Sequence, residues 1–146
     1  MIPFREREWP SFWPSAAGLL EWAKRARMFA YAPYSGFSVG AALYEEGRED
    51  FLPGCNVENA SYSLSLCAER NAVGAMVVRG GRRPLAIAIA GRPGEPCFPC
   101  GACRQFLAEF NPELLVVLEN GADPLILSLA DLFPAPFALK GGPFHG

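Results

Sequence analysis

Several features that define other classes of protein are scarce in this sequence. Histidine occurs once, as His145, which we interpret as a solvated tail residue, so a metal site built from imidazoles is excluded. The longest apolar runs, such as 85–90 and 114–118, are far shorter than the roughly 20 residues that cross a bilayer. Residues 1–10 lack the continuous apolar segment of a secretory signal. These absences predict a cytoplasmic protein with no membrane partner.

An excess of positive charge is also missing. The chain carries 13 Lys and Arg against 15 Asp and Glu, a net charge of −2. A protein that neutralises a phosphate backbone needs the opposite balance, so no nucleic-acid partner is expected. Charged residues make up only 19% of the 146 residues and hydrophobic residues 51%, which predicts one folded domain around a single core.

Alternating helical and strand patterns predict the fold class. Apolar spacing and capping signals predict helices over 15–29, 61–80, 101–110 and 129–133. Apolar and alternating runs predict strands over 37–44, 51–58, 85–90, 114–119 and 125–127. The unbroken apolar run 85–90 is typical of a central strand that is covered on both faces. This order predicts an α/β fold, a three-layer sandwich with a central mixed sheet of about five strands.

Three finer expectations concern the ends and faces of these elements. The first two strands are expected to form an antiparallel hairpin. The hydroxyl of Ser63 or Ser65 is expected to cap the second helix. In the third helix, the side chains of Phe106 and Leu107 are expected to face inward.

The cysteines carry the strongest chemical signal. There are five, an odd number with three inside seven residues, which indicates reduced thiols rather than a disulfide framework. Cys67 lies in C-A-E-R at the start of one predicted helix, and Cys100 and Cys103 lie in P-C-G-A-C at the start of the next. Residues three apart in a first helical turn point the same way, and helix N-termini favour thiolates. The pattern predicts that these three cysteines bind one Zn²⁺.

The residues beside these cysteines indicate catalysis. Three thiolates leave the fourth tetrahedral position of zinc open to water, and this open position distinguishes catalytic from structural zinc sites. Glu69, two residues after Cys67, is suited to take and return protons there. Arg70 is placed to hydrogen-bond the thiolates and to withdraw their excess negative charge. C-x-E followed by P-C-x-x-C is the all-cysteine form of the zinc deaminase signature.

Two other interpretations of the cysteines stay open. A C-x-x-C pair alone is more often a structural zinc knuckle or a redox pair. Cys97 also forms C-x₂-C-x₂-C with Cys100 and Cys103, which opens some iron–sulfur patterns and would be completed by Cys67. Those patterns place a fourth cysteine, followed by proline, soon after the third, whereas residues 104–106 here are Arg-Gln-Phe. We therefore interpret Cys97, like Cys55, as a spare thiol.

Four segments resemble the small zinc-dependent cytidine deaminases that act on free nucleosides. They are A-P-Y-S-G-F-S-V-G-A-A-L (32–43), G-C-N-V-E-N-A-S-Y-S (54–63), C-A-E-R (67–70) and P-C-G-A-C-R-Q (99–105). The resemblance covers a domain of residues 15–137, between an N-terminal arm (1–14) and a C-terminal tail (138–146). It implies zinc-dependent hydrolysis of cytidine and 2′-deoxycytidine to uridine and 2′-deoxyuridine, a step of pyrimidine salvage.

The resemblance also implies roles for individual residues. It makes Cys67, Cys100 and Cys103 the zinc ligands, Glu69 the proton shuttle and Arg70 the residue that tempers the thiolate charge. It implies that four residues contact the substrate, namely Phe37 on the pyrimidine, Asn56 and Glu58 on the ribose, and Ala68. Side chains two apart in an extended segment also share a face, so the ribose pair is geometrically reasonable. The family is homotetrameric, which implies that three residues reach a neighbouring subunit's site: Ala60, Tyr62 and Phe137.

Some positions depart from the family pattern. Ser38 stands where proline is usual, Phe133 stands where leucine is usual, and 138–142 replaces a commonly acidic stretch. The aromatic, proline-rich arm has no counterpart in the pattern. These departures bear on assembly rather than on the chemistry. Other functions that remain are deamination of another small aminated pyrimidine nucleoside of the antibiotic type, editing of a polynucleotide, and a non-catalytic binding module stabilised by metal.

Overall fold

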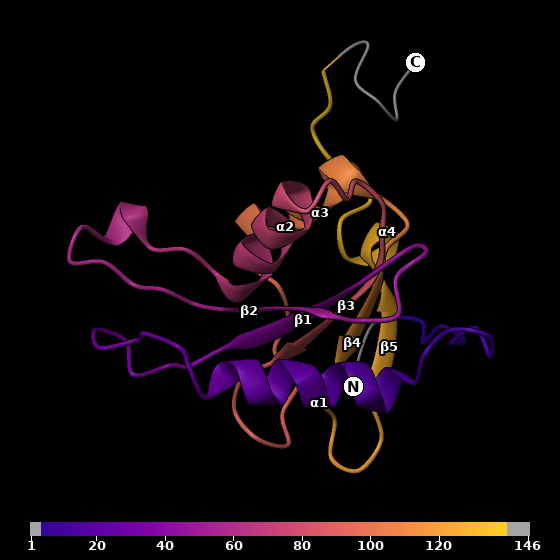
Figure 1. Cartoon of the computed structure of the whole chain (residues 1–146), viewed down its shortest axis with the longest axis horizontal. Coiled ribbons are helices and arrows are strands. Elements are labelled where there is room, and N and C mark those ends of the chain that lie inside the picture. Colours follow the sequence, from indigo (N-terminus) through magenta and orange to yellow (C-terminus); the bar gives the residue numbers. More distant parts are fainter. Residues whose placement is uncertain (1–3, 140–146) are drawn as a thin grey trace.

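The computed structural model describes residues 4–139 and shows a five-stranded mixed sheet between two layers of helices (Figure 1). Its elements, in chain order, are α1 (Ala16–Arg27), β1 (Gly40–Glu45), β2 (Leu52–Cys55), η1 (Tyr62–Leu64), α2 (Ala68–Val78), β3 (Pro84–Ala90), α3 (Gly101–Phe110), β4 (Leu115–Leu118), β5 (Leu125–Ser128) and α4 (Leu129–Leu132). The predicted α/β three-layer sandwich is confirmed. No helix among the described residues is both long enough and apolar enough to span a membrane.

The sheet has the strand order β2-β1-β3-β4-β5, so β3 lies at its centre, as predicted. Strand β3 runs parallel to β4 and antiparallel to β1, and the other pairs are antiparallel, including the expected β1–β2 hairpin. Its side chains alternate between two cores, one on each face, because the sheet divides the single core that composition predicted. Ile87 and Ile89 pack under α2 and α3, whereas Ala86, Ala88 and Ala90 face α1. The small alanines let α1 approach the sheet closely.

Two glycines let the helices touch the hairpin. A Cβ atom on Gly54 would lie 2.4 Å from the carbonyl oxygen of Ala68 and 2.6 Å from the nitrogen of Ala72. A Cβ atom on Gly40 would lie 1.9 Å from the carbonyl oxygen of Ala23. The backbone of α2 therefore rests directly on β2, and this contact fixes the N-terminus of α2 against the sheet.

Several predicted element ends differ from the structure. Neither Ser63 nor Ser65 caps α2, because residues 62–64 form the short helix η1 and α2 begins only after Cys67. The strand predicted over 51–58 ends at Cys55. In α3, Leu107 is buried as expected, but Phe106 is 41% exposed, so its inward placement was wrong. His145 lies outside the described residues.

Candidate metal centre and substrate cavity

Three thiols from two helix starts form one cluster. The sulfur atoms of Cys67, Cys100 and Cys103 all lie within 4.8 Å of one another, and those of Cys67 and Cys100 are 3.9 Å apart. Tetrahedral zinc with Zn–S bonds of about 2.3 Å needs sulfurs about 3.8 Å apart, so the donor set fits zinc. Cys97 is not a member of this cluster among the described residues. The geometry therefore supports three sulfur ligands with the fourth position free of protein sulfur, and not a four-cysteine cluster.

The electrostatics of the cluster favour a thiolate at Cys67. A hydrogen bond from the Cys103 thiol and another from Arg70 lower the pKa of Cys67 to about 5, against the opposing effect of burial. Nη2 of Arg70 lies 3.6 Å from the Cys67 sulfur and 3.4 Å from the carbonyl oxygen of Ser65. The same thiol pairing, together with burial, raises the pKa of Cys103. Arg70 thus lies within reach of the Cys67 sulfur, and its predicted role in tempering the thiolate charge stays a prediction.

Glu69 lies in the first turn of α2 and is only 4% exposed. Burial raises its pKa, and the neighbouring charge of Cys67 adds to this effect. A carboxyl group with a raised pKa holds and releases a proton closer to neutral pH, which general acid–base catalysis requires. Its position beside the thiols suits it to proton transfer.

A cavity of about 300 Å³ opens above the thiols and collects the predicted substrate-side residues. Its lining includes Phe37, Asn56, Glu58, Ala68 and Glu69, together with the ligand candidates Cys67 and Cys100. Cys103 is fully buried and does not line the cavity. Residues predicted from three separate motifs therefore meet around one space.

Asn56 and Glu58 hold the chain that carries Phe37. The side-chain oxygen of Asn56 accepts a hydrogen bond from Val39 N (2.8 Å), and its Nδ2 donates to Phe37 O (2.8 Å). The carboxylate of Glu58 accepts from the backbone nitrogens of Tyr34 and Ser35 (3.0 Å each) and from the Ser35 hydroxyl. The hydroxyl hydrogen bond lowers the pKa of Glu58, so this carboxylate faces the cavity in its charged form.

Sequence reasoning missed several residues of the site. Val39, Cys97 and Phe98 line the cavity with the predicted residues. Arg104 holds the loop before α3, because its Nε donates to Pro99 O (2.8 Å) and its Nη1 donates to Leu132 O (2.7 Å). The position of Cys97 and Phe98 directly before the P-C-x-x-C motif was a usable signal for the cavity wall. No periodicity in the sequence indicates the Arg104 contact with α4.

Three predicted site residues do not reach this cavity within the chain. Ala60 is exposed, and Tyr62 and Phe137 are 74% and 70% exposed. Tyr62 lines an adjoining hollow that shares Ser35 and Glu58 with the main cavity. The backbone of Phe137 pairs with the side chain of Gln105 on α3. Their assignment to a neighbouring subunit stays a prediction.

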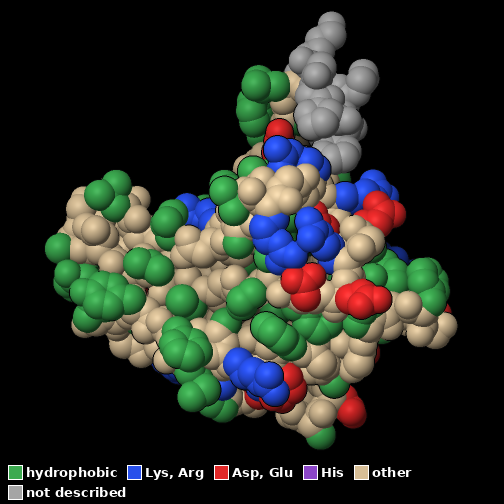
Figure 2. Space-filling view, in the orientation of Figure 1, with side chains coloured by type: hydrophobic (Ala, Val, Ile, Leu, Met, Phe, Trp, Pro, Cys, Tyr) green, Lys and Arg blue, Asp and Glu red, His purple; other side chains and the backbone are tan. Residues whose placement is uncertain are grey.

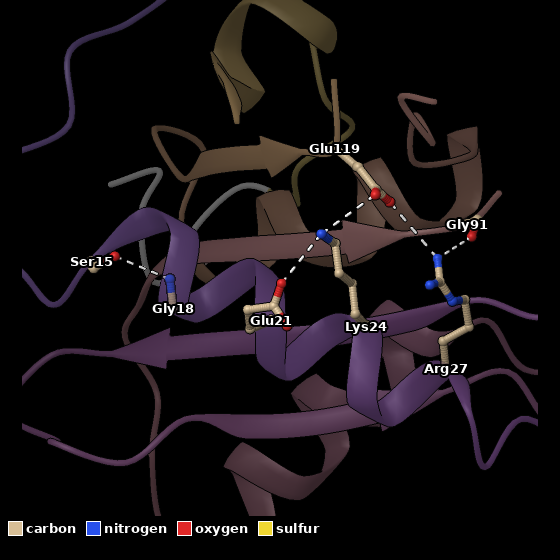
Figure 3. Close-up of polar contacts among 7 residues, drawn as sticks. All are labelled: Ser15, Gly18, Glu21, Lys24, Arg27, Gly91 and Glu119. Atoms are coloured by element: carbon tan, nitrogen blue, oxygen red, sulfur yellow. Dashed lines mark hydrogen bonds and ion pairs between the residues drawn. The ribbon is translucent and has the colours of Figure 1, made fainter. Parts of the chain in front are cut away.

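A charge network around the buried Glu119 joins α1 to the segment that follows β3 (Figure 3). Glu119, 6% exposed, lies 3.4 Å from Lys24 Nζ and 3.8 Å from Arg27 Nη1 of α1. The Arg27 guanidinium also donates to the carbonyl oxygen of Gly91, just beyond β3. A Cβ atom on Gly91 would lie 3.0 Å from the Phe37 ring and 2.9 Å from the Cys97 sulfur. The network thus fixes the point where two walls of the cavity meet.

Replacing Gly91 with alanine is expected to raise the KM for substrate about 3- to 10-fold, because Phe37 and Cys97 must shift to admit the methyl group. Steady-state kinetics measures this change. Gly74→Ala is the matched control, since a Cβ atom there meets nothing within 4 Å. An unchanged KM in Gly91→Ala, or an equal rise in the control, would contradict the inference that Gly91 leaves room for Phe37 and Cys97 to form the cavity wall.

The site defines a class of protein. Two helix N-termini present three thiols, and a buried carboxyl group follows the first thiol by two residues, which is the arrangement of the zinc-dependent deaminases.

Comparisons with known proteins identify the family within this class. The protein-family model for the cytidine and deoxycytidylate deaminase zinc-binding region matches residues 15–119. The cytidine deaminase of Sporosarcina psychrophila is 43% identical over 82% of this chain and 89% of its own length. The crystal structure of cytidine deaminase from Burkholderia pseudomallei covers 85% of this chain and 100% of its own, with 47% identity and a TM-score of 0.79. The chain belongs to the cytidine deaminase family.

Proposed function

We propose that this chain catalyses the hydrolytic deamination of cytidine and 2′-deoxycytidine, in which water replaces the 4-amino group and ammonia is released. The observation that carries the proposal is the convergence of Glu69, Phe37, Asn56 and Glu58 on one cavity whose floor holds Cys67 and Cys100. Its volume of about 300 Å³ suits a single nucleoside rather than a folded polynucleotide. The acidic net charge points in the same direction.

The proton transfers fall to Glu69. The chemistry that zinc supplies when bound is the activation of water as a nucleophile near neutral pH. The Glu69 carboxylate takes the proton of the attacking water and delivers it to N3 of the pyrimidine ring. It then takes the second proton and delivers it to the amine that leaves C4, so that the atoms balance as ammonia and a uracil ring. One buried carboxyl group thus handles every proton.

Binding and orientation fall to the cavity walls. The ring of Phe37 offers an apolar face for the pyrimidine. The ionised Glu58 accepts hydrogen bonds from a ribose hydroxyl, and the amide of Asn56 has one further N–H to donate. Ala68, at the start of α2, lines the cavity beside Glu69, and its small side chain leaves room for the pyrimidine. These contacts orient C4 toward the thiol cluster.

A panel of substrates tests the proposal. Zinc-loaded protein is expected to convert cytidine and 2′-deoxycytidine, which the change in ultraviolet absorbance reports. Free cytosine lacks the sugar that Asn56 and Glu58 bind, so its kcat/KM is expected to be about 10²- to 10³-fold lower. Single-stranded DNA is expected to remain unchanged. Failure to convert cytidine, or equal conversion of cytosine, would overturn the proposed function.

We also infer that the chain assembles as a homotetramer and works in the cytoplasm. Residues 31–36 and 57–66 form an extension on which hydrophobic side chains gather (Figure 2), among them the exposed Tyr34, Tyr62 and Leu64. Light scattering is expected to give a mass near four times 15.8 kDa, and a fully active monomer would contradict the assembly. All five cysteines are free thiols, which suits a reducing compartment.

A further inference from the structure

The N-terminal arm is anchored to the domain at two places (residues 4–14 of it are described). Arg7 donates through its backbone nitrogen to Ile126 O of β5 (2.8 Å), and its guanidinium binds both carboxylate oxygens of Asp131 in α4 (2.9 Å each from Nη2). The ring of Trp13 packs edge-on against Tyr44 of β1, with centroids 5.5 Å apart. In Figure 1 the arm extends beyond the β5 edge of the sheet before it leads into α1. The arm therefore passes from the α1 face to the opposite side of the sheet along a fixed path.

At the far end of this path, Phe4 reaches the catalytic side of the molecule. Its side chain packs against the core under α2 and α3. The ring centroids of Phe4 and Phe98 are 6.1 Å apart, with the planes tilted by 49°. Phe98 lines the substrate cavity and precedes the ligand candidate Cys100 by two residues. A residue near the start of the chain thus contacts the wall of the site.

The loop that carries Phe98 depends on side-chain packing for its position. Among the described residues, no backbone–backbone hydrogen bond outside the regular elements involves residues 96–99. The Arg104 guanidinium holds Pro99 O, at the end of the loop nearest α3. On the N-terminal side of Phe98, the side chain of Cys97 packs against Gly91. The ring of Phe4 is the aromatic partner of Phe98 between these two points.

We propose that Phe4 is a positioning residue for the substrate cavity, holding Phe98 in the place where it forms the wall against which the nucleoside binds. The proposal rests on the proposed function, because it assigns the cavity to that substrate. Phe4 acts through Phe98 and touches no reacting group. Small displacements of a cavity wall weaken binding of substrate and transition state alike, so the effect is expected in KM rather than in kcat.

The first experiment compares three variants of the full zinc-loaded chain. Phe4→Ala is expected to raise the KM for cytidine about 5- to 10-fold with kcat within about twofold of the original. Phe4→Leu restores the apolar contact and is expected to return KM to within about twofold. Phe12→Ala is the matched control, because Phe12 lies on the same arm but is 85% exposed, with its ring centroid 6.4 Å from that of Trp13. A fall in kcat and melting temperature without a change in KM would overturn the proposal.

A double-mutant cycle tests whether Phe4 acts through Phe98. Phe98→Ala is expected to raise KM by itself, and adding Phe4→Ala to it is expected to produce no further rise. Independent, multiplicative effects of the two substitutions would overturn the proposal. Both results are read against the original chain, whose turnover of cytidine is tested separately, so a failed positioning role and a failed function are distinguishable.

A third measurement needs no substrate. Cys97 is half-buried beside Phe98 and lines the cavity, so the rate of its reaction with iodoacetamide reports how far the loop exposes this thiol; mass spectrometry locates the modified residue among Cys97, Cys100 and Cys103. Phe4→Ala is expected to speed this alkylation about fivefold or more, and Phe12→Ala to leave its rate unchanged. Equal alkylation rates in all forms would show that Phe4 does not hold the loop, whatever the substrate of the enzyme.

Discussion

Replacing Glu69 with glutamine is expected to abolish turnover of cytidine and to leave zinc in place. The amide has nearly the same shape as the carboxyl group, but it can neither take a proton from water nor deliver one to the leaving amine. Loss of general acid–base catalysis alone lowers kcat by about 10²- to 10⁴-fold. Because Glu69 performs every proton transfer in the proposed reaction, we expect the upper end of this range. Glu69 is not part of the thiol cluster, so the substitution removes no zinc ligand.

The measurement pairs single-turnover kinetics with metal analysis of the same sample. Glu109→Gln makes the same chemical change at an exposed position of α3 and is expected to keep full activity. Substantial residual turnover in Glu69→Gln would show that the carboxyl group does not transfer the protons of the reaction. Loss of zinc from this variant would instead make Glu69 a ligand, which the geometry of the thiols does not indicate.

The sequence predicted α3 to the residue because local signals mark both of its ends. Pro99 stands just before its N-cap residue, Cys100, and Asn111 followed by Pro112 cannot continue a helix. The same local logic placed the three ligand candidates and Glu69, because all of them belong to helix starts. Short-range rules therefore suffice to predict the residues at the floor of the cavity.

The rim of the cavity depends on contacts that no local pattern shows. Beyond the end of β2, Val57 pairs with Leu66 through two backbone hydrogen bonds of 2.9 Å. Because of this pairing, residues 56–58 do not extend β2, and residue 66 does not belong to α2. The strand expected to begin at residue 37 begins at Gly40, because the amide of Asn56 binds the backbone at Phe37 and Val39. Side chains from a distant segment here replace a strand partner.

The N-terminal arm was the least predictable part for the same reason. Its decisive contacts join Arg7 to Asp131, which are 124 residues apart in the chain, and Phe4 to Phe98. The arm is rich in aromatic residues and proline, but its composition contains no information about which surface it covers. The surfaces that the arm contacts, on β5, α4 and β1, come together only in the folded chain.

Replacing Cys103 with alanine is expected to eliminate stoichiometric zinc binding and activity together. Cys103 is fully buried, and its sulfur completes the set of three that surrounds the metal position. Two remaining thiols hold zinc far more weakly, and a metal that binds only the folded state also stabilises it, so the melting temperature of the zinc-treated variant is expected to fall by several degrees. Metal analysis after dialysis and calorimetry measure the two effects.

The two cysteines outside the cluster turn this loss into a test of the number of sulfur ligands. Cys55→Ala and Cys97→Ala are both expected to keep one zinc per chain, because neither sulfur belongs to the cluster of three among the described residues. A four-cysteine centre would lose its metal in Cys97→Ala as completely as in Cys103→Ala. Zinc retained in Cys97→Ala and lost in Cys103→Ala is compatible only with a centre that has three sulfur ligands. Such a centre leaves a position at which water can bind and enter the reaction.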